Sequence, residues 1–231
     1  MTFKIVFLRH GESEWNKYNK FTGWYDVNLN DKGKKEAKKA GLLLKKKNIT
    51  FDLAYTSVLK RAIFTLWSVL KKVNQPWLKI YKTWRLNERH YGCLQGLNKD
   101  SVIQIYGKKN IFNWRRSFSV VPPYISKFND YWSGYDSRYS HMNKNDIPLG
   151  ESLKLTLKRI LPYWEKNIIP KIKKNKKILI VAHGNTLRSL IKYLSKIPEK
   201  DVPDLNIPTG QPIIYEFNKN CEPIKYYFLK K

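Results

Sequence analysis

The stretch "KIVFLRHGESEWN" (residues 4–16) joins an apolar run to an Arg-His pair with no turn residue between them. A buried strand is expected over 4–8, and an Arg beside a His at its end costs desolvation energy unless something compensates. The same arrangement returns in "KKILIVAHGN" (176–185), where a second apolar run leads into His-Gly. Ligands of parallel α/β sheets bind beyond the carboxyl ends of the strands. The two stretches therefore predict one sheet edge that carries both His10 and His183.

Strands and helices alternate along the rest of the chain. Apolar runs predict strands, and apolar residues at a 3.6-residue period predict helices. Strands are expected over 4–8, 51–56, 78–81, 176–185, 213–217 and 224–229, and helices over 31–47, 58–72, 99–106, 109–117, 152–166 and 185–195. This order favours an α/β fold with three layers, in which a mainly parallel β-sheet is flanked by helices on both faces.

One segment matches neither period. Residues 118–150 contain Pro122, Pro123, Gly134 and Pro148 among many aromatic and polar residues. A long irregular segment in a compact domain is typically a lid or a binding loop. We therefore predict a single domain over 1–231, with an irregular insertion or lid at about 118–150.

The bulk composition limits the class of protein. The 231 residues are 42% hydrophobic, which is typical of a globular chain. No apolar run approaches the roughly 20 residues of a membrane span, and no signal-peptide pattern opens the chain. We therefore expect a cytoplasmic protein without a membrane partner. Cys93 and Cys221 lie far apart in sequence, outside any CxxC motif, and we expect reduced thiols.

The formal net charge of +27 has two interpretations: attraction to an anion, either a nucleic acid or a small phosphorylated substrate, or a solvated lysine-rich surface that reflects AT-rich coding. The lysines are spread along the whole chain, and we see no recognisable nucleic-acid-binding module, which argues against a specific nucleic acid. The nine arginines are more informative. Several stand beside other unusual residues, as Arg9 does before His10, and a guanidinium group suits bidentate phosphate binding.

Two histidines at one sheet edge suit phosphoryl transfer. Neutral imidazole is a nucleophile near pH 7, and the transferred group mainly needs positive charges and hydrogen-bond donors around it. Arg9 and Arg61 are candidates for those charges, while Glu12 and Glu88 are both candidate general acids. With no Walker loop and no Asp cluster suited to magnesium, we expect a mechanism without a metal.

Seven stretches of the chain carry a specific resemblance. They are "LRHGESEWN" (8–16), "FTGWYDVNLNDKG" (21–33), "YTSVLKRA" (55–62), "LNERHYGCLQGLNK" (86–99), "WRRSF" (114–118), "VAHGNTLR" (181–188) and "LNIPTGQPIIYEF" (205–217). Together they resemble the cofactor-dependent (2,3-bisphosphoglycerate-dependent) phosphoglycerate mutases of the histidine phosphatase superfamily. "RHG" alone would indicate only the superfamily, whereas the combination is specific for the mutase branch.

The resemblance implies a reaction and a role for each matching residue. The family interconverts 3-phosphoglycerate and 2-phosphoglycerate in glycolysis and gluconeogenesis, primed by 2,3-bisphosphoglycerate. His10 would be the nucleophile, Glu88 the proton donor and acceptor, and Arg9, Arg61 and His183 would hold the phosphoryl group. The remaining substrate-binding positions would be Ser13, Asn16, Thr22, Gly23, Tyr91, Lys99, Arg115, Arg116, Gly184 and Asn185. The family also implies a homo-oligomer, either a dimer or a tetramer.

Three alternatives accompany this reading. A bisphosphoglycerate synthase or phosphatase would use the same site, and the sequence given ends at "YYFLKK", before the longer basic tail that many family members carry over the active site. A nucleic-acid-binding protein and a catalytically inactive scaffold are the other two. The sequence contains the nucleophile, the arginines that would surround the phosphoryl group and the general acid, and this complete set argues against an inactive scaffold.

Overall fold

Parallel pairing between β1 (Phe3–Arg9) and β4 (Ile178–Ala182) lies at the centre of the sheet. The protein is represented by a computed structural model that describes residues 2–230. Within these residues the strands form one six-stranded sheet in the order β3-β2-β4-β1-β5-β6. The first four are mutually parallel, whereas β5 runs antiparallel to β1 and β6 antiparallel to β5. The predicted mainly parallel sheet is thus confirmed.

The other strands are β2 (Leu53–Thr56), β3 (Ile80–Lys82), β5 (Pro212–Phe217) and β6 (Pro223–Phe228). The helices are α1 (Glu14–Lys17), α2 (Asp31–Lys46), α3 (Lys60–Lys72), α4 (Lys99–Arg116), α5 (Leu153–Tyr163), α6 (Ile169–Lys173) and α7 (Gly184–Leu194). Short 3-10 turns occur at Trp84–Leu86, Gly92–Leu94, Ser133–Tyr135, Ser137–Tyr139 and Glu199–Asp204. No helix within residues 2–230 is long and apolar enough to cross a membrane.

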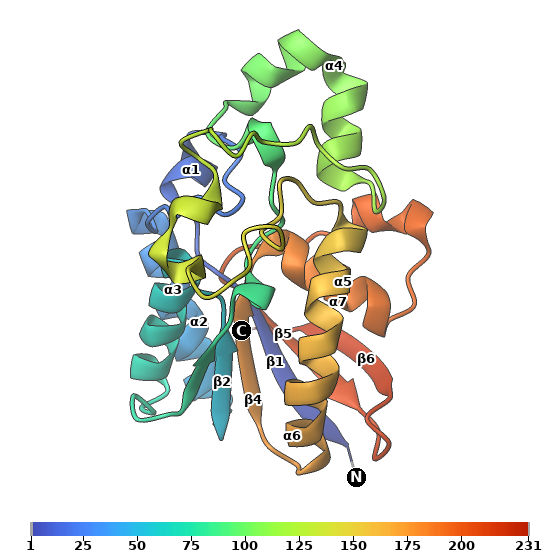
Figure 1. Ribbon diagram of the computed structural model, residues 1–231. Coiled ribbons are helices and arrows are strands. Elements are labelled where there is room, and N and C mark those ends of the chain that lie inside the picture. Colours follow the sequence, from blue (N-terminus) through green and yellow to red (C-terminus); the bar gives the residue numbers. More distant parts are fainter. Residues whose placement is uncertain (1, 231) are drawn as a thin grey trace.

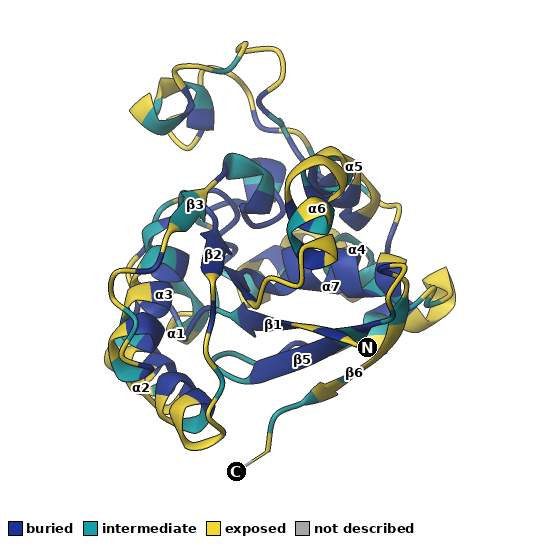
Figure 2. Cartoon of the chain, turned by 90° about the horizontal axis from the view of Figure 1, so that it is seen from below, coloured by how far each residue is buried: buried dark blue, intermediate teal, exposed yellow. Residues whose placement is uncertain are grey.

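Helices cover both faces of the sheet, as predicted. Alternate residues of β1 point to opposite faces, so Val6 and Leu8 pack toward α2 and α3, whereas Ile5 and Phe7 pack toward α5 and α7. Figure 1 shows the two helical layers on either side of the strands, with α4 standing above the carboxyl ends of the sheet. Figure 2 shows buried β1 and β5 between these layers and the more exposed β6 at the edge.

The sequence explains where α2 begins and which face it buries. The Asn30 side chain accepts a hydrogen bond from the Gly33 N–H at 2.8 Å, which satisfies one of the donors left free at a helix start. Ala37, Ala40 and Leu44 recur at helical spacing and are buried, whereas the intervening lysines face solvent.

The helix predicted over 152–166 continues further than expected. After α5 the chain makes a π-helical turn over Trp164–Ile168 and enters α6, which ends at Lys173. Pro170 has no N–H, and in a regular α-helix its ring would clash with the Lys166 carbonyl. The wider π-turn accommodates this residue, so the helical path bends rather than stops.

A glycine also interrupts α4, close to the boundary expected between two helices. Gly107 has φ +79° and ψ 152°, a conformation that only glycine adopts readily, so the element consists of two helical halves. From 118 to 150 the chain is irregular, with only the two 3-10 turns at Ser133–Tyr135 and Ser137–Tyr139.

The glycine of the first His-Gly pair allows close contact between β1 and α2. A Cβ on Gly11 would lie 2.2 Å from the Gly33 carbonyl oxygen, and a Cβ on Gly33 would lie 2.0 Å from the Glu12 carbonyl oxygen. Both atoms belong to backbone, which cannot move aside as a flexible side chain can. The two glycines therefore fix how near the start of α2 lies to the end of β1.

We expect Gly11→Ala to lower the free energy of unfolding by about 1–3 kcal/mol, because the added methyl group overpacks this backbone contact. Urea denaturation followed by circular dichroism measures the change. Lys38→Ala, at an exposed position of α2, is the control and should change the free energy by less than about 0.5 kcal/mol. An unchanged denaturation midpoint for Gly11→Ala would contradict the predicted contact.

Candidate active site

The β1–β4 register places the two strand-end histidines side by side. Arg9 pairs with Ala182, and the His10 N–H donates to the Ala182 carbonyl at 3.0 Å. The next residue of each strand, His10 and His183, therefore emerges at the same edge. Their ring centroids lie 4.9 Å apart in an edge-to-face arrangement. The sequence-based expectation that one edge carries both histidines is confirmed.

The hydrogen bonding of His10 leaves one ring nitrogen free for nucleophilic attack. Nδ1 lies 2.6 Å from the Gly11 carbonyl oxygen, which can only accept, so Nδ1 carries the proton. Burial, together with the nearby charges of Arg61 and Arg9, lowers the pKa of His10 well below its ordinary value of 6.5. The ring is therefore neutral, and Nε2 has an available lone pair.

Two buried arginines flank the histidines. Arg61 is 1% exposed, and its guanidinium donates to the carbonyl oxygens of Gly23 at 2.8 Å and Tyr25 at 3.0 Å. Burial lowers the pKa of Arg61 to about 10. Arg9 donates from Nη1 to the Ile207 carbonyl at 2.7 Å, while its buried Nε has no partner among residues 2–230. Each side chain is held by neutral carbonyls, so its charge is not cancelled by a carboxylate contact.

A carboxylate lies at the start of α7. Glu88 Oε1 accepts from the Asn185 N–H at 3.1 Å and from the Arg89 N–H at 2.8 Å. Glu88 lines the pocket at the N-terminus of α7, and a helix N-terminus favours negative charge. Glu12, the other candidate acid, instead accepts from Asn30 and Lys32 at 2.8 Å and 2.7 Å, outside the pocket lining.

A buried ion pair supports the segment that carries Glu88. Arg159 on α5 contacts Glu151 at 2.7 Å and also donates to the carbonyl oxygens of Arg85, Asn87 and Glu88 at 2.6, 2.9 and 2.9 Å. Planar guanidinium donors can satisfy several acceptors at once in a fixed geometry. Arg159 therefore connects the backbone of residues 85–88, which includes Glu88, to α5.

These elements surround one pocket at the carboxyl edge of the sheet. All the predicted site residues line it except His183, whose ring packs edge-to-face against the ring of His10. The lining residues are Arg9, His10, Ser13, Asn16, Lys20, Phe21, Thr22, Gly23, Arg61, Glu88, Tyr91, Lys99, Arg115, Arg116, Gly184, Asn185, Arg188 and Asn206. Seven of these are Lys or Arg and one is Glu, so the pocket fits a ligand with more than one anionic group.

Sequence reasoning assigned no site role to Lys20, Phe21, Arg188 and Asn206. Arg188 could have been found, because it follows Asn185 by one helical turn and both side chains lie on one face of α7. Its Nη1 donates to Asn185 Oδ1 at 2.6 Å, and Asn185 Nδ2 donates to the Tyr91 hydroxyl at 3.1 Å. Asn206 gives no such signal, because only the fold brings it to the pocket.

The backbone at Gly184 lies close to the Arg9 side chain. A Cβ there would lie 3.2 Å from both Cζ and Nε of Arg9. Ser13 and Asn16 bond each other, since Asn16 Oδ1 accepts from Ser13 Oγ at 2.9 Å. This bond uses the Asn16 carbonyl oxygen and leaves its amide N–H groups for a ligand.

The insertion packs beside this pocket. The Tyr131 ring contacts Tyr25 and Trp15, with ring centroids 5.0 and 6.2 Å apart, and Tyr25 stacks on Trp15. Arg138 forms an ion pair with Asp26, which follows the Gly23 and Tyr25 carbonyls that hold Arg61.

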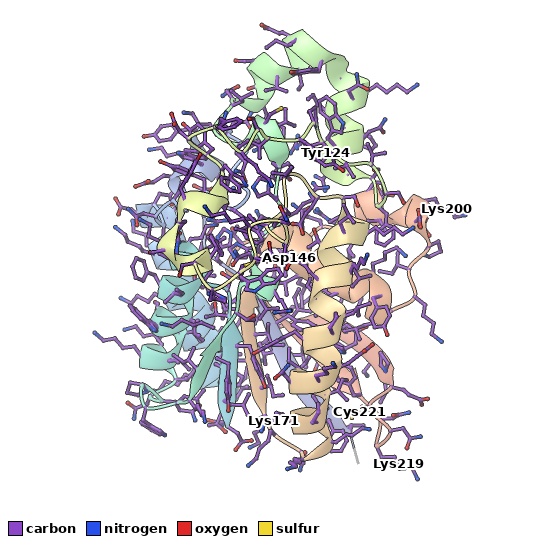
Figure 3. The ribbon with its side chains drawn as sticks, in the orientation of Figure 1. Tyr124, Asp146, Lys171, Lys200, Lys219 and Cys221 are labelled. Carbon is purple, nitrogen blue, oxygen red and sulfur yellow. The ribbon has the colours of Figure 1, made fainter. Side chains whose placement is uncertain are left out.

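Lysines such as Lys171 and Lys219 lie at the opposite end of the molecule, far below α4 (Figure 3).

No group of three or more His, Cys, Asp or Glu side chains within residues 2–230 could hold a metal ion. The pocket does fit a polyanion on its own chemistry. The Nε of Arg9 and the Nδ1 of His183 are buried without a partner among the described residues, and phosphate oxygens are the acceptors that such donors prefer. Cys93 and Cys221 are free thiols.

This fold and site belong to a known class. The family model of the histidine phosphatase superfamily (branch 1) matches residues 5–133 and 127–229, and the chain belongs to that superfamily. Two relatives from Buchnera aphidicola are named 2,3-bisphosphoglycerate-dependent phosphoglycerate mutase. The chain is 55% identical to the one from subsp. Cinara cedri (strain Cc) and 58% to the one from subsp. Acyrthosiphon pisum (strain 5A), over 98% of each chain. The resemblance inferred from the motifs is thereby confirmed.

Solved structures share the fold at low sequence identity. Phosphoglycerate mutase from Bacillus anthracis str. Sterne superposes with a TM-score of 0.69 and 24% identity, covering 98% of this chain and 91% of that one. A mycobacterial glucosyl-3-phosphoglycerate phosphatase superposes with a TM-score of 0.74 and 22% identity, covering 99% and 98%. These neighbours confirm the predicted phosphoglycerate mutase-like α/β fold.

We expect the free energy of unfolding to fall as the pH drops below about 6.5, where histidines of the unfolded chain gain protons. Burial lowers the pKa of His90 to about 3 and holds the pKa values of His10 and His183 well below 6.5. The folded chain thus binds fewer protons than the unfolded chain, so acidification favours unfolding. Each buried histidine contributes up to about 1.4 kcal/mol per pH unit.

Urea denaturation between about pH 7 and about pH 5 measures this slope. His90→Gln should reduce it, while His141→Gln, at an exposed position, should leave it unchanged. Equal slopes for the native chain and His90→Gln would show that burial does not hold His90 neutral.

Proposed function

We propose that this chain interconverts 3-phosphoglycerate and 2-phosphoglycerate in glycolysis and gluconeogenesis, through a phosphohistidine on His10 primed by 2,3-bisphosphoglycerate. The observation that carries the proposal is the neutral His10, with Nε2 unprotonated, on the wall of a pocket lined by seven cationic side chains. The two Buchnera relatives named as this enzyme, at 55% and 58% identity, support the same reaction.

In the first step His10 Nε2 attacks phosphorus, so that an N–P bond forms as the P–O bond to the primer breaks. Arg9, Arg61 and the N–H of His183 stabilise the negative oxygens of the transferred group, which is the main requirement of phosphoryl transfer. Glu88 donates a proton to the oxygen that leaves. In the second step the Glu88 carboxylate takes the proton of the attacking substrate hydroxyl, and the phosphoryl group passes from His10 to that oxygen.

Further cations of the same pocket bind the rest of the substrate. Arg115, Arg116, Lys99 and Arg188 line the pocket in addition to the arginines beside His10. A phosphoglycerate has a carboxylate as well as a phosphate, and the bisphosphate primer carries a third anionic group. A second cluster of cations therefore matches the substrate's second charge, with Tyr91 and Asn185 as hydrogen-bond partners.

We expect the protein to gain one phosphoryl group on His10 after brief incubation with 2,3-bisphosphoglycerate, since among residues 2–230 His10 is the histidine that lines the pocket and its Nε2 has an available lone pair. Intact-protein mass spectrometry followed by peptide mapping detects the group. His10→Ala should remain unmodified, and a phosphoryl group on another residue would overturn the mechanism.

In a steady-state assay of 2-phosphoglycerate formation, Glu88→Gln should slow conversion of 3-phosphoglycerate about 10²–10⁴-fold, because general acid–base help of that size is lost. The KM should change little, because Gln retains the acceptor oxygen for the Asn185 N–H. Glu12→Gln is the matched control and should turn over normally. Rapid hydrolysis of 2,3-bisphosphoglycerate without production of 2-phosphoglycerate would favour the phosphatase alternative.

We further propose that the chain forms a homo-oligomer, as the family resemblance implies. We propose that the outer face of α3 forms the interface. Phe64 and Trp67 are 41% and 50% exposed there, with ring centroids 5.5 Å apart, and Trp77 is 73% exposed just beyond the helix. Exposed aromatic groups of this kind are typical of protein interfaces.

A cytoplasmic location follows from the proposed reaction, whose metabolites are cytoplasmic.

Trp67→Glu should shift the chain toward monomer in sedimentation velocity, because a buried carboxylate would be costly at an apolar interface. Phe128→Glu, at a 92% exposed position of the insertion, is the control and should leave the sedimentation coefficient unchanged. A native chain that sediments as a monomer at micromolar concentration would refute the interface.

A further inference from the structure

Ser57 is a buried residue next to the active site for which the proposed reaction has no role so far. It follows β2 directly, is 0% exposed, and does not line the pocket. Its Oγ lies 2.8 Å from His183 Nε2 and accepts from the Leu59 N–H at 3.2 Å. Ser57 therefore connects the end of β2 to the end of β4 through one side chain of the catalytic cluster.

The direction of the Ser57–His183 bond follows from counting protons. A serine hydroxyl has one hydrogen to donate. Among residues 2–230, His183 Nε2 is the atom within hydrogen-bonding distance that could accept from the Ser57 hydroxyl, while the Leu59 N–H donates to the same oxygen. If Nε2 carried the hydrogen instead, both the Ser57 O–H and the Nδ1 lone pair would be buried without partners within these residues, whereas the other tautomer leaves the Nδ1–H alone unpaired. The hydroxyl thus donates, and Nε2 accepts.

The other nitrogen of His183 then has to carry the ring proton. Burial and the nearby Arg61 lower the pKa of His183 well below 6.5, so the ring is neutral and has a single N–H. That N–H is Nδ1, which is buried and has no partner within the described residues. The edge-to-face packing, with centroids 4.9 Å apart, places this ring directly beside His10.

We propose that Ser57 is a positioning residue that holds His183 in the Nδ1–H tautomer, so that this N–H donates to the phosphoryl group carried by His10. The two histidines are thereby set in complementary roles. The Gly11 carbonyl keeps a proton on His10 Nδ1 and leaves its Nε2 as nucleophile, while Ser57 keeps a proton on His183 as donor. This inference rests on the proposed phosphohistidine reaction only for the identity of the acceptor.

Long-range ¹H–¹⁵N NMR of histidine-labelled protein, without any phosphorylated ligand, tests the tautomer directly. The chain has four histidines, and the His90→Gln and His141→Gln variants help to assign them. We expect a protonated Nδ1 and an unprotonated Nε2 at His183 in the native chain, and a mixture of tautomers in Ser57→Ala. A protonated Nε2 in the native chain, or an unchanged tautomer in Ser57→Ala, would overturn the proposal.

Kinetics supply the second readout. Ser57→Ala should lower the rate of phosphoryl transfer by about 10- to 100-fold with little change in KM, the loss expected for one hydrogen bond to a charged group. Ser57→Thr retains the hydroxyl and should restore both the tautomer and the rate. A Ser57→Ala variant with the native rate, or a loss of rate that Ser57→Thr does not restore, would contradict the role.

Thr56→Val is the matched control for general damage at this point of the fold. Thr56 is also 0% exposed, and its hydroxyl also bonds β4, at the Val181 carbonyl 2.8 Å away, but it contacts no histidine in that bond. We expect this variant to lose stability while the His183 tautomer stays native. If native protein showed the expected tautomer but no phosphoryl group on His10, the proposed function would fail while the Ser57–His183 arrangement stood.

Discussion

The parallel hydrogen bonding between β1 and β4 is the constraint on which the site depends. Arg9 lies opposite Ala182, and this register brings together two histidines that are far apart in sequence. A slip of one residue would turn the side chains of a strand to the opposite face, because successive residues alternate. The apolar residues of β1 prevent such a slip, since Val6 and Phe7 each pack into a different core cluster. The precise placement of His10 beside His183 therefore comes from the packing of the sheet.

The electrostatics of the pocket follow from how its cations are held. Arg61 and Arg9 are positioned by neutral carbonyl groups, so their charges stay available and the ligand-free pocket remains unfavourably positive. Burial lowers the pKa of both side chains, because the charged form costs free energy in a desolvated site. An anion removes this cost by supplying acceptors to desolvated donors. Binding and folding are thus coupled, and an anionic ligand stabilises the native chain.

Much of the fold and the site could be predicted from local patterns, because strands, caps and helical faces are written in adjacent residues. The His-Gly repeats and the clustered arginines were readable in this way. The choice between Glu12 and Glu88 was not readable from the residues alone, since each lies within two residues of an Arg-His pair and only tertiary contacts separate them. Ser57 escaped notice for the same reason: its partner lies 126 residues away. The π-turn after α5 was missed because the expected helix ended at 166, whereas buried Ile168 and Ile172 continue the helical path into α6.

The position of β1 in the sheet has a consequence for how the protein is made. Its two neighbours are β4 and β5, so β1 pairs only with strands that are made about 170 or more residues after it. The Ile207 carbonyl that holds Arg9 is 198 residues from it, and the loop carrying Asn206 closes the pocket wall. Contacts of such high sequence separation form late and slow the folding of a domain. The nascent chain must therefore keep the apolar strand β1 unpaired until β4 has been made, and the pocket can assemble only after the segment with Asn206 and Ile207 has followed.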